Sequence, residues 1–210
     1  MIELFSADTP NGKKISIMLE EINLEYKVIK VDLHNNKEQF NPEFRKISPF
    51  SKIPVIIDHD NNKEAVFESG AILMYLGERS NKFYHKENRI IINQWLMAQM
   101  GYVGPMIGQH HQFHHYHRGK SEFGEKRYFE ITKRIYEDLN ERLGQCNFLA
   151  GESYTIADIA TWPWIARHTI HDIGLANYDH LSRWYIEIAK RPAVIKGYKI
   201  MDKEGAIPLP

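Results

Sequence analysis

A short segment near the N-terminus combines the start of a helix with two hydrogen-bonding side chains, in the order Thr9-Pro10-Asn11-Gly12. Thr is favoured immediately before a helix, and Pro is favoured at the first helical position. Asn11 then falls in the first turn, where free N–H groups carry a positive potential. The Thr9 hydroxyl and the Asn11 amide could therefore stabilise a bound thiolate, because helix N-termini lower thiol pKa values. The alternative is an ordinary capped helix, and these residues alone leave both open.

Two further segments could bind a ligand that carries charges of both signs. In Lys52-Ile53-Pro54-Val55, Pro54 fits the start or edge of a strand because it has no N–H to donate. Glu68-Ser69 follows fourteen residues after Pro54, where helical spacing begins. The Ser69 hydroxyl and the N–H groups after it could bind a carboxylate, and Glu68 could accept a hydrogen bond from an ammonium. The alternative is that Ser69 is a plain N-cap and Glu68 a solvated charge.

Residues 109–117 form a histidine-rich tract, QHHQFHHYH. His110 and His114 are four residues apart, as are His111 and His115, so each pair could hold a metal ion if the tract were helical. The chain has no HExxH motif, and the tract contains no carboxylate as a third ligand. We therefore predict no metal site here.

The first 80 residues alternate the patterns of strands and helices. Strand patterns are apolar or alternating runs between turn residues, and helix patterns repeat apolar side chains at three and four residues. The order strand–helix–strand followed by strand–strand–helix predicts a small mixed sheet with helices on its faces. We expect strands at residues 2–6, 26–32, 53–58 and 65–67, and helices at 42–47, at 69–79 and around Ile15, Met18, Leu19 and Ile22.

Residues 80–87 are polar and aperiodic, which predicts two domains, 1–82 and 87–210. Almost no strand pattern occurs beyond this boundary, so the second domain is expected to be all-helical. Residues 100–119 look irregular and are expected to extend or cap the helix at 88–100. The tail after Lys199 is expected to be extended. The predicted helices are 88–100, 125–143, 156–171 and 181–190.

The composition excludes several classes of protein. The chain of 210 residues has 27 basic and 27 acidic side chains, so no net field favours nucleic acid or a membrane surface. No apolar run approaches the length of a membrane span, and the N-terminus lacks the pattern of a signal peptide. The single cysteine, Cys146, allows neither an internal disulfide nor a CxxC redox motif. We expect a protein of the reducing cytoplasm.

These motifs, taken in order along nearly the whole chain, resemble those of glutathione transferases. Residues 52–55 and 68–72 resemble the glutathione-binding half of that fold, residues 153–160 its helical capping motif, and residues 191–193 its final helix. Residues 9–15, 104–110 and 162–164 are similar to the nu class, whose members are described as glutathione-dependent disulfide-bond reductases. The resemblance implies an α/β thioredoxin-like N-terminal domain followed by an all-α C-terminal domain.

The resemblance also implies a glutathione site. It makes Thr9 and Asn11 the catalytic pair, with Ser6 as the alternative because other transferases use Tyr, Ser or Cys near this point. It implies a cis Ile53–Pro54 bond, which would let the Ile53 backbone pair with the peptide ligand. The glutathione contacts that it implies are Asn11, Gln39, Lys52, Ile53, Pro54, Glu68, Ser69 and Arg127, with Arg134 as a rival on the same helix.

The activity implied is disulfide exchange by bound glutathione, which acts as a substrate, with no protein cysteine and no metal. The alternatives are conjugation of glutathione to an electrophile and non-catalytic binding in a regulatory protein. The expected partners are a small disulfide or electrophile and a second copy of the chain in a homodimer. The His tract would line the second-substrate wall.

Two other features are predicted to be structural. Thr155 and Asp158 have the spacing of a capping box, so Asp158 is expected to stabilise the fold and not to act as a catalytic acid. Cys146 lies far in sequence from the predicted site, and we expect no catalytic role for it.

Overall fold

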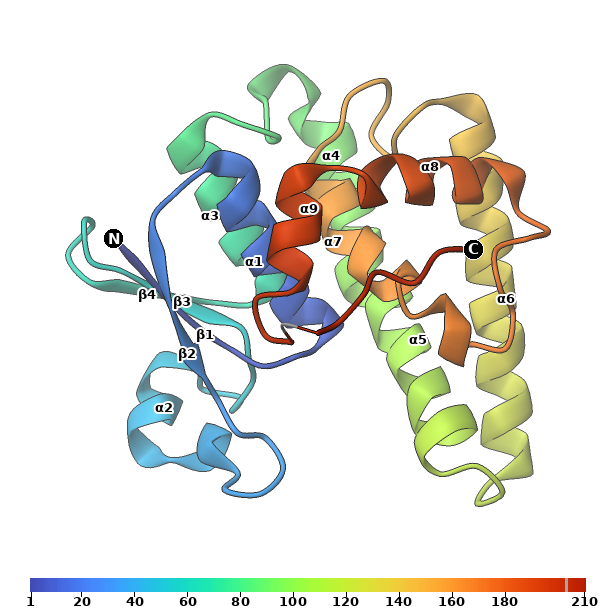
Figure 1. The fold of residues 1–210 in the computed structure, drawn as a ribbon, viewed down its shortest axis with the longest axis horizontal. Coiled ribbons are helices and arrows are strands. Elements are labelled where there is room, and N and C mark those ends of the chain that lie inside the picture. The colour runs from blue at the N-terminus through green and yellow to red at the C-terminus, as the bar shows by residue number, and fades with distance from the viewer. Residues whose placement is uncertain (203) are drawn as a thin grey trace. The chain divides into compact units, whose positions relative to one another are not determined.

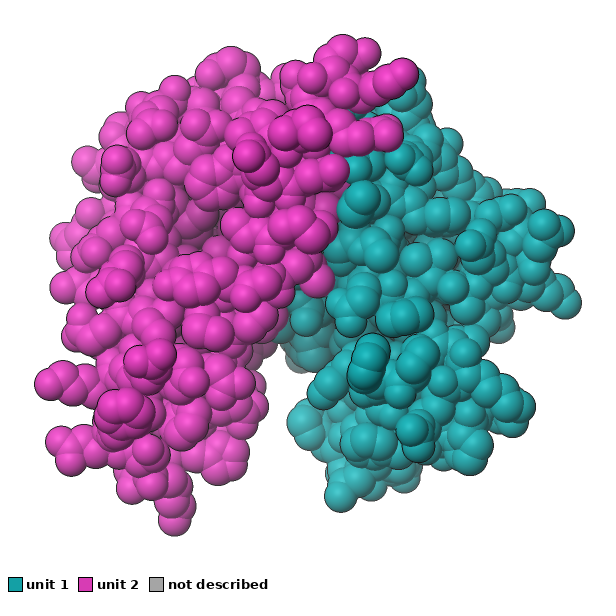
Figure 2. Space-filling model, turned by 180° about the vertical axis from the view of Figure 1, so that it is seen from behind, with its two compact units in different colours: residues 1–85, 191–206 teal, residues 86–190, 207–210 magenta. Residues whose placement is uncertain are grey.

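The computed structural model describes residues 1–202 and 204–210, which form two compact units (Figures 1 and 2). The first unit comprises Met1–His85 together with Arg191–Ala206, and the second comprises Lys86–Lys190 together with Ile207–Pro210. The C-terminal helix therefore belongs with the N-terminal residues. No helix among the described residues is long and apolar enough to cross a membrane.

The first unit is built on a four-stranded mixed sheet with the strand order β2-β1-β3-β4. Strand β1 pairs in parallel with β2 and antiparallel with β3, and β3 pairs antiparallel with β4, as the sequence order predicted. The elements of this unit are β1 (Ile2–Ser6), α1 (Pro10–Ile22), β2 (Tyr26–Lys30), α2 (Pro42–Ile47), β3 (Val55–Asp58), β4 (Glu64–Phe67), α3 (Ser69–Ser80) and α9 (Pro192–Tyr198).

The two faces of this sheet are covered by different helices. Ile2 and Leu4 of β1 are fully buried on one face, and α1 packs against both α3 and α9. The alternate residue Phe5 points to the other face, where it meets Phe44 of α2 edge-on at 6.3 Å between ring centroids. Figure 1 shows α2 on the opposite side of the sheet from α1 and α3. This alternation is the expected consequence of the two-residue period of a strand.

The second unit is helical throughout its regular structure. Its α-helices are α4 (Arg89–Ala98), α5 (Gly104–His110), α6 (Glu122–Gln145), α7 (Ile156–Ile165) and α8 (Asp179–Ala189). Helix α5 runs beside the long helix α6 (Figure 1). Every residue of α7 is buried, so this helix forms the centre of the unit.

Residues 100–119 extend the first helix of this unit, as expected, although most of the range is helical and not irregular. Two π-helical segments, Gln99–Val103 and His111–Tyr116, flank α5 and make the chain helical from α4 onward. Pro105 is tolerated because it lies in the first turn of α5, after the wider π-helical segment. A side chain at Gly104 would meet Gln99 and the ring of Trp164, so glycine there reflects close packing, not a loop.

The predicted helix 156–171 is also too long. Helix α7 ends at Ile165, two residues after the internal Pro163, and a separate 3-10 turn covers His168–Ile170. In the tail predicted to be extended, the described residues after Lys199 form no helix or strand, and Lys203 lies outside the described residues.

Candidate functional site

The start of α1 has the geometry predicted for Thr9. Thr9 is the N-cap residue, with extended backbone angles, and its Oγ1 accepts a hydrogen bond from Gly12 N at 3.0 Å. Pro10 follows at the start of the helix. A hydroxyl can accept and donate at once, so Thr9 can cap the helix and still direct its own proton to a ligand. Thr9 and Asn11 are both partly exposed.

Gly12 explains why α1 begins so close to β1. A Cβ at this position would overlap with Ala7 O and with Ser6 Oγ, so only glycine fits without a shift. The same packing covers Ser6, whose side chain is fully buried. Ser6 is therefore not presented to a ligand, whereas Thr9 is partly exposed.

Three predicted segments converge at one end of the sheet. The β1–β3 register pairs Phe5 with Val55, and the β3–β4 register pairs Val55 with Phe67. Next to these positions along the chain are Ser6 after Phe5, Pro54 before Val55, and Glu68 after Phe67. Ser6 leads on to Thr9. Three segments thus meet at this end of the sheet: the helix start at Thr9, the loop before β3, and the helix start at Ser69. They lie up to sixty residues apart in sequence.

The loop before β3 has a fixed shape. The Ile53–Pro54 peptide bond is cis, as the resemblance implied. Ser48 Oγ accepts a hydrogen bond from Lys52 N at 3.0 Å and donates to Lys52 O at 2.7 Å. These bonds hold the backbone at Lys52, whose side chain is exposed to solvent. Pro54 itself is buried at the entry to β3.

The start of α3 differs from an ordinary capped helix. Glu68, not Ser69, is the N-cap residue, and it makes no side-chain capping hydrogen bond. Its backbone lies at φ 69°, a region that non-glycine residues seldom occupy. Ser69 is the first helical residue and is buried. The alternative that Ser69 is a plain N-cap is therefore wrong.

One residue of this region was missed by the sequence analysis. Lys14 of α1 is 1% exposed, and its Nζ donates to Ser69 Oγ at 3.3 Å. Burial lowers the pKa of this amine to about 7, against the attraction of Glu68. Its burial could have been predicted from its spacing, because Lys14 lies four residues before Met18, on the apolar face of the same helix.

The remaining predicted contacts are spread over both units. Gln39 lies in the first unit, where its Nε2 donates to Leu33 O at 3.2 Å and its buried Oε1 has no hydrogen-bond partner among the described residues. Arg127 and Arg134 lie on exposed positions of α6 in the second unit. Together they line an open groove of about 590 Å³ whose other lining residues are Tyr102, Met106, Phe123, Lys126, Glu130 and Ile131.

The histidine tract contributes to the core of the second unit. His111 Nε2 lies 2.7 Å from Nε2 of the fully buried His171, and the other His171 nitrogen lies 2.6 Å from the Tyr136 hydroxyl. His110 contacts the His171 carbonyl at 3.1 Å. Burial lowers the pKa of His110 to about 4 and that of His111 to about 3, and it holds the pKa of His171 well below its usual value. These imidazoles are therefore neutral at pH 7.

Only part of the tract is exposed. His114 bonds to Asp172 at 2.9 Å, whereas His115 and His117 are at the surface. Within residues 1–202 and 204–210, no three His, Cys, Asp or Glu side chains converge in an arrangement that could hold a metal ion.

Two groups in the second unit have structural roles. The Asp158 carboxylate is fully buried and accepts hydrogen bonds from Thr155, from Leu149 N and from the Trp184 indole, which confirms the predicted capping box. The Cys146 thiol donates to Phe148 O at 3.0 Å, and burial raises its pKa. A thiol with a raised pKa is a poor nucleophile.

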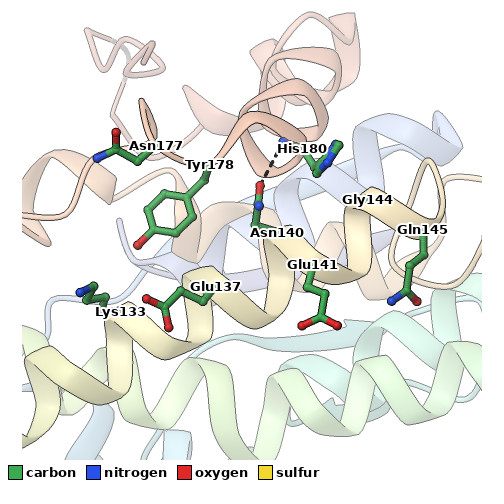
Figure 3. A pocket seen from close by; sticks show the side chains of 9 residues that line it. All are labelled: Lys133, Glu137, Asn140, Glu141, Gly144, Gln145, Asn177, Tyr178 and His180. Atoms are coloured by element: carbon green, nitrogen blue, oxygen red, sulfur yellow. Dashed lines mark hydrogen bonds between the residues drawn. The ribbon is translucent and has the colours of Figure 1, made fainter.

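A second open groove, of about 770 Å³, lies between α6 and the start of α8 (Figure 3). Its central amide, Asn140, already accepts from His180 N and Leu181 N at 3.0 and 3.1 Å. Asn140 therefore caps α8. None of the residues predicted to act on glutathione lines this groove, which includes Lys133, Glu137, Glu141 and Tyr178.

Comparison with known proteins decides the family. Residues 2–78 match the glutathione S-transferase N-terminal domain, and residues 99–192 match the glutathione S-transferase C-terminal domain. The chain belongs to the glutathione S-transferase family. Among its relatives is the disulfide-bond oxidoreductase YfcG of Escherichia coli, which is 46% identical over 92% of both chains. The predicted family and its two-part fold are thus confirmed.

Two solved structures extend the comparison. A glutathione transferase from Burkholderia graminis, with two glutathione molecules bound per subunit, superposes with a TM-score of 0.89 at 36% identity, covering 97% of this chain and 89% of that one. A glutathione transferase from Pseudomonas putida, with one glutathione disulfide bound per subunit, gives a TM-score of 0.88 at 39% identity, with coverage of 95% and 91%. Members of this transferase family with the same fold therefore bind both the reduced and the oxidised tripeptide.

Proposed function

We propose that this transferase is a glutathione-dependent disulfide-bond oxidoreductase that uses no cysteine of its own. The observation that carries the proposal is that three segments converge at one end of the sheet. These are the Thr9 helix start, the Pro54 loop and the Glu68–Ser69 helix start. The only cysteine, Cys146, lies in the other unit. The attacking sulfur is therefore that of glutathione. The similarity to YfcG and to structures holding glutathione disulfide supports the same activity.

The site has a group for each part of the tripeptide. The first turn of α3, with Ser69, binds the γ-glutamyl carboxylate, and Glu68 accepts from the α-ammonium. The Ile53 backbone, turned at Pro54, pairs with the cysteinyl residue as an added strand would. Lys52 and Gln39 provide polar groups for the glycyl end. We propose Thr9 and Asn11 as the catalytic residues, because a hydroxyl and an amide at a helix N-terminus stabilise the thiolate.

The reaction needs two equivalents of glutathione. The first thiolate attacks one sulfur of the disulfide in line with the S–S bond, forms a mixed disulfide, and releases the other sulfur as a thiolate that takes up a proton. A second glutathione thiolate attacks the glutathione sulfur of the mixed disulfide. This step forms glutathione disulfide and releases the second substrate thiol. Binding of two glutathione molecules per subunit in the Burkholderia graminis enzyme supports this stoichiometry.

We further propose that the protein acts in the reducing cytoplasm as a homodimer in which Arg127 contributes to glutathione binding. Arg127 and Arg134 sit seven residues apart on α6 and line the same groove. Comparison of Arg127→Ala with Arg134→Ala by glutathione titration distinguishes the two, since weakened binding is expected only for Arg127→Ala. Sedimentation equilibrium measures the oligomeric state.

The test of the activity is steady-state reduction of bis(2-hydroxyethyl) disulfide by glutathione, coupled to glutathione reductase. Loss of a hydrogen bond to a charged group is worth about 1.5–3 kcal/mol, so Thr9→Ala and Asn11→Ala should lose roughly 10- to 100-fold in rate. Thr9→Ser should stay active because it keeps the hydroxyl. Ser121→Ala is the matched control: Ser121 caps α6 by the same bond, from Gly124 N at 3.1 Å, and its loss should spare activity.

The outcomes separate the competing functions. Turnover of the disulfide that falls in Thr9→Ala and not in Ser121→Ala supports the proposal. Turnover of 1-chloro-2,4-dinitrobenzene without turnover of disulfides would instead indicate a conjugating transferase. Glutathione binding with neither reaction would indicate a non-catalytic binding protein.

A further inference from the structure

A chain of hydrogen bonds joins three side chains in the core of the second unit. The Tyr136 hydroxyl of α6 lies 2.6 Å from His171 Nδ1, and His171 Nε2 lies 2.7 Å from His111 Nε2. Tyr136 and His171 are fully buried, whereas His111 is 6% exposed. These are the only hydrogen bonds that the three side chains make among the described residues.

The Tyr136 hydroxyl fixes the direction of this chain. It is buried and has one acceptor within reach, His171 Nδ1, and a buried hydroxyl proton left without an acceptor is unfavourable. Tyr136 therefore donates to Nδ1. His171 is neutral, so its own proton is on Nε2, which donates to His111 Nε2. His111 is neutral as well, and its proton is then on Nδ1.

The Nδ1–H group of His111 is a donor that the protein itself does not use. No described residue accepts a hydrogen bond from it, and Nδ1 is not among the buried side-chain atoms that lack a partner, so it is open to solvent. The ring is held in place by His171 and by Trp164, on which it stacks at 5.8 Å between centroids. A donor with a fixed position and a fixed tautomer is suited to binding an acceptor from outside the chain.

Arg167 adds a positive charge beside this donor. Its backbone N–H donates to Trp164 O at 3.2 Å, in the turn that follows α7. Its charge is close enough to His111 and His171 to lower the pKa of both imidazoles. The side chain is half-buried, and in the described part of the chain no carboxylate pairs with it. A guanidinium is always charged in proteins and binds a carboxylate through two parallel hydrogen bonds.

No acidic group offsets this positive charge at His111. The groups whose charges act on the pKa of His111 are Arg167 and two histidines of the same tract, His110 and His115. Asp172, five residues after Arg167, is paired at 2.9 Å with another histidine of the tract. The surroundings of the His111 donor therefore favour an anion.

We propose that His111 and Arg167 form a binding site for the carboxylate of a small molecule on the second unit. Arg167 pairs with the two carboxylate oxygens, and His111 Nδ1–H donates to one of them. Tyr136 and His171 are positioning residues, because they hold the proton of His111 on the nitrogen that faces the ligand. The inference does not depend on the proposed function, since all four residues lie in the second unit.

The tautomer of His111 is the first measurement. Long-range proton–nitrogen NMR spectra of protein labelled with nitrogen-15 histidine distinguish Nδ1–H from Nε2–H, and His111→Phe identifies the signals. Wild type at pH 7 should carry the proton on Nδ1. Tyr136→Phe keeps the ring and removes the donor, so it should bring the Nε2–H form of His111 to a measurable population. A wild-type His111 protonated on Nε2 would overturn the proposal, and that observation depends on no variant other than the one used for assignment.

Binding is tested with benzoate, and with benzamide as its uncharged counterpart, by the same NMR signals in the full-length protein. Benzoate should shift the His111 resonances saturably, and benzamide should bind at least tenfold more weakly. Hydrogen bonds to charged groups are the stronger class, so Arg167→Gln and His111→Phe should each weaken benzoate binding roughly 10- to 100-fold. Tyr136→Phe should weaken it less, because the Nδ1–H form remains partly populated.

Arg118→Gln is the matched control, because it removes an arginine of the same unit whose side chain is 66% exposed. It should bind benzoate within twofold of wild type. Equal losses in Arg118→Gln and Arg167→Gln would indicate a general effect of charge and would overturn the site. Wild type that gives no saturable shift with benzoate, or that binds benzamide equally well, would overturn it too.

Discussion

The buried histidines make a quantitative prediction about acid stability. His110, His111 and His171 are neutral in the folded protein because burial lowers each pKa below the ordinary value of 6.5. In the unfolded chain the same imidazoles take up protons as pH falls through 6.5. The unfolded state then binds more protons than the folded state, so the free energy of unfolding must decrease with falling pH.

The size of the decrease in the free energy of unfolding follows from the pH range between the unfolded and the folded pKa of each histidine. The stabilisation is fully present above pH 6.5 and is lost toward pH 4 for His110 and toward pH 3 for His111. Each histidine contributes a slope of about 1.4 kcal/mol per pH unit inside its window. Between pH 6.5 and pH 5 these two histidines should together lower the free energy of unfolding by roughly 4 kcal/mol, and His171 adds to this decrease. Such a loss is a large fraction of the stability of a typical domain.

The assay is urea unfolding of wild type at a series of pH values, followed by near-ultraviolet and far-ultraviolet circular dichroism. His111→Phe removes one titrating group and keeps a ring against Trp164, on which His111 stacks at 5.8 Å. Its slope between pH 6.5 and pH 5 should be shallower by about 1.4 kcal/mol per unit. His115→Phe, at an exposed position of the same tract, is the control and should keep the wild-type slope. A wild-type midpoint that is constant over this range would refute the burial argument.

Three further predictions concern single substitutions. Gly12→Ala should lower the free energy of unfolding by roughly 1–3 kcal/mol in urea titrations, because the new methyl overlaps with Ala7 O; unchanged stability would contradict the close packing of α1 on β1. Cys146→Ala should leave the rate of disulfide reduction within twofold of wild type, since its thiol is bonded to Phe148 O and has a raised pKa, and a loss of tenfold would implicate a protein thiol. Lys14→Met should gain stability relative to wild type as pH falls from 10.5 toward 7, because burial lowers the pKa of the Lys14 amine to about 7. Wild-type stability should rise from pH 7 to about 10.5, where only the unfolded state keeps the proton, and the variant should lack that rise.

Local patterns were sufficient to predict most of the sheet and the helix starts around the site. The strand pattern at residues 2–6 and the Thr9-Pro10 start were predicted because both depend on near neighbours in sequence. The same holds for the capping box of Thr155 and Asp158. The remaining site residues were predicted from the resemblance to the nu class, because hydrophobic periodicity does not show which distant residues form one site.

The errors arise where tertiary packing overrides local preference. Gly104 and Pro105 are poor helix formers, yet the chain is helical there because α7 packs Trp164 against the glycine surface. The sequence offered the tract containing His111 as part of a second-substrate wall and gave no sign that His111 bonds to the buried His171, sixty residues away. Lys14 was overlooked because its hydrogen-bond acceptor Ser69 lies on another helix. Sequence spacing carries no signal for such contacts.

The central claim is that the start of α1 stabilises the thiolate of bound glutathione without a protein cysteine. The most direct measurement is a pH titration of the thiolate ultraviolet absorbance of glutathione bound to the protein. Free thiols have a pKa of about 8.5, and the account predicts that binding to wild type or to Thr9→Ser lowers it by one unit or more. In Thr9→Ala the pKa should return most of the way to that of free glutathione. An unshifted thiol pKa in the wild-type complex would contradict the account.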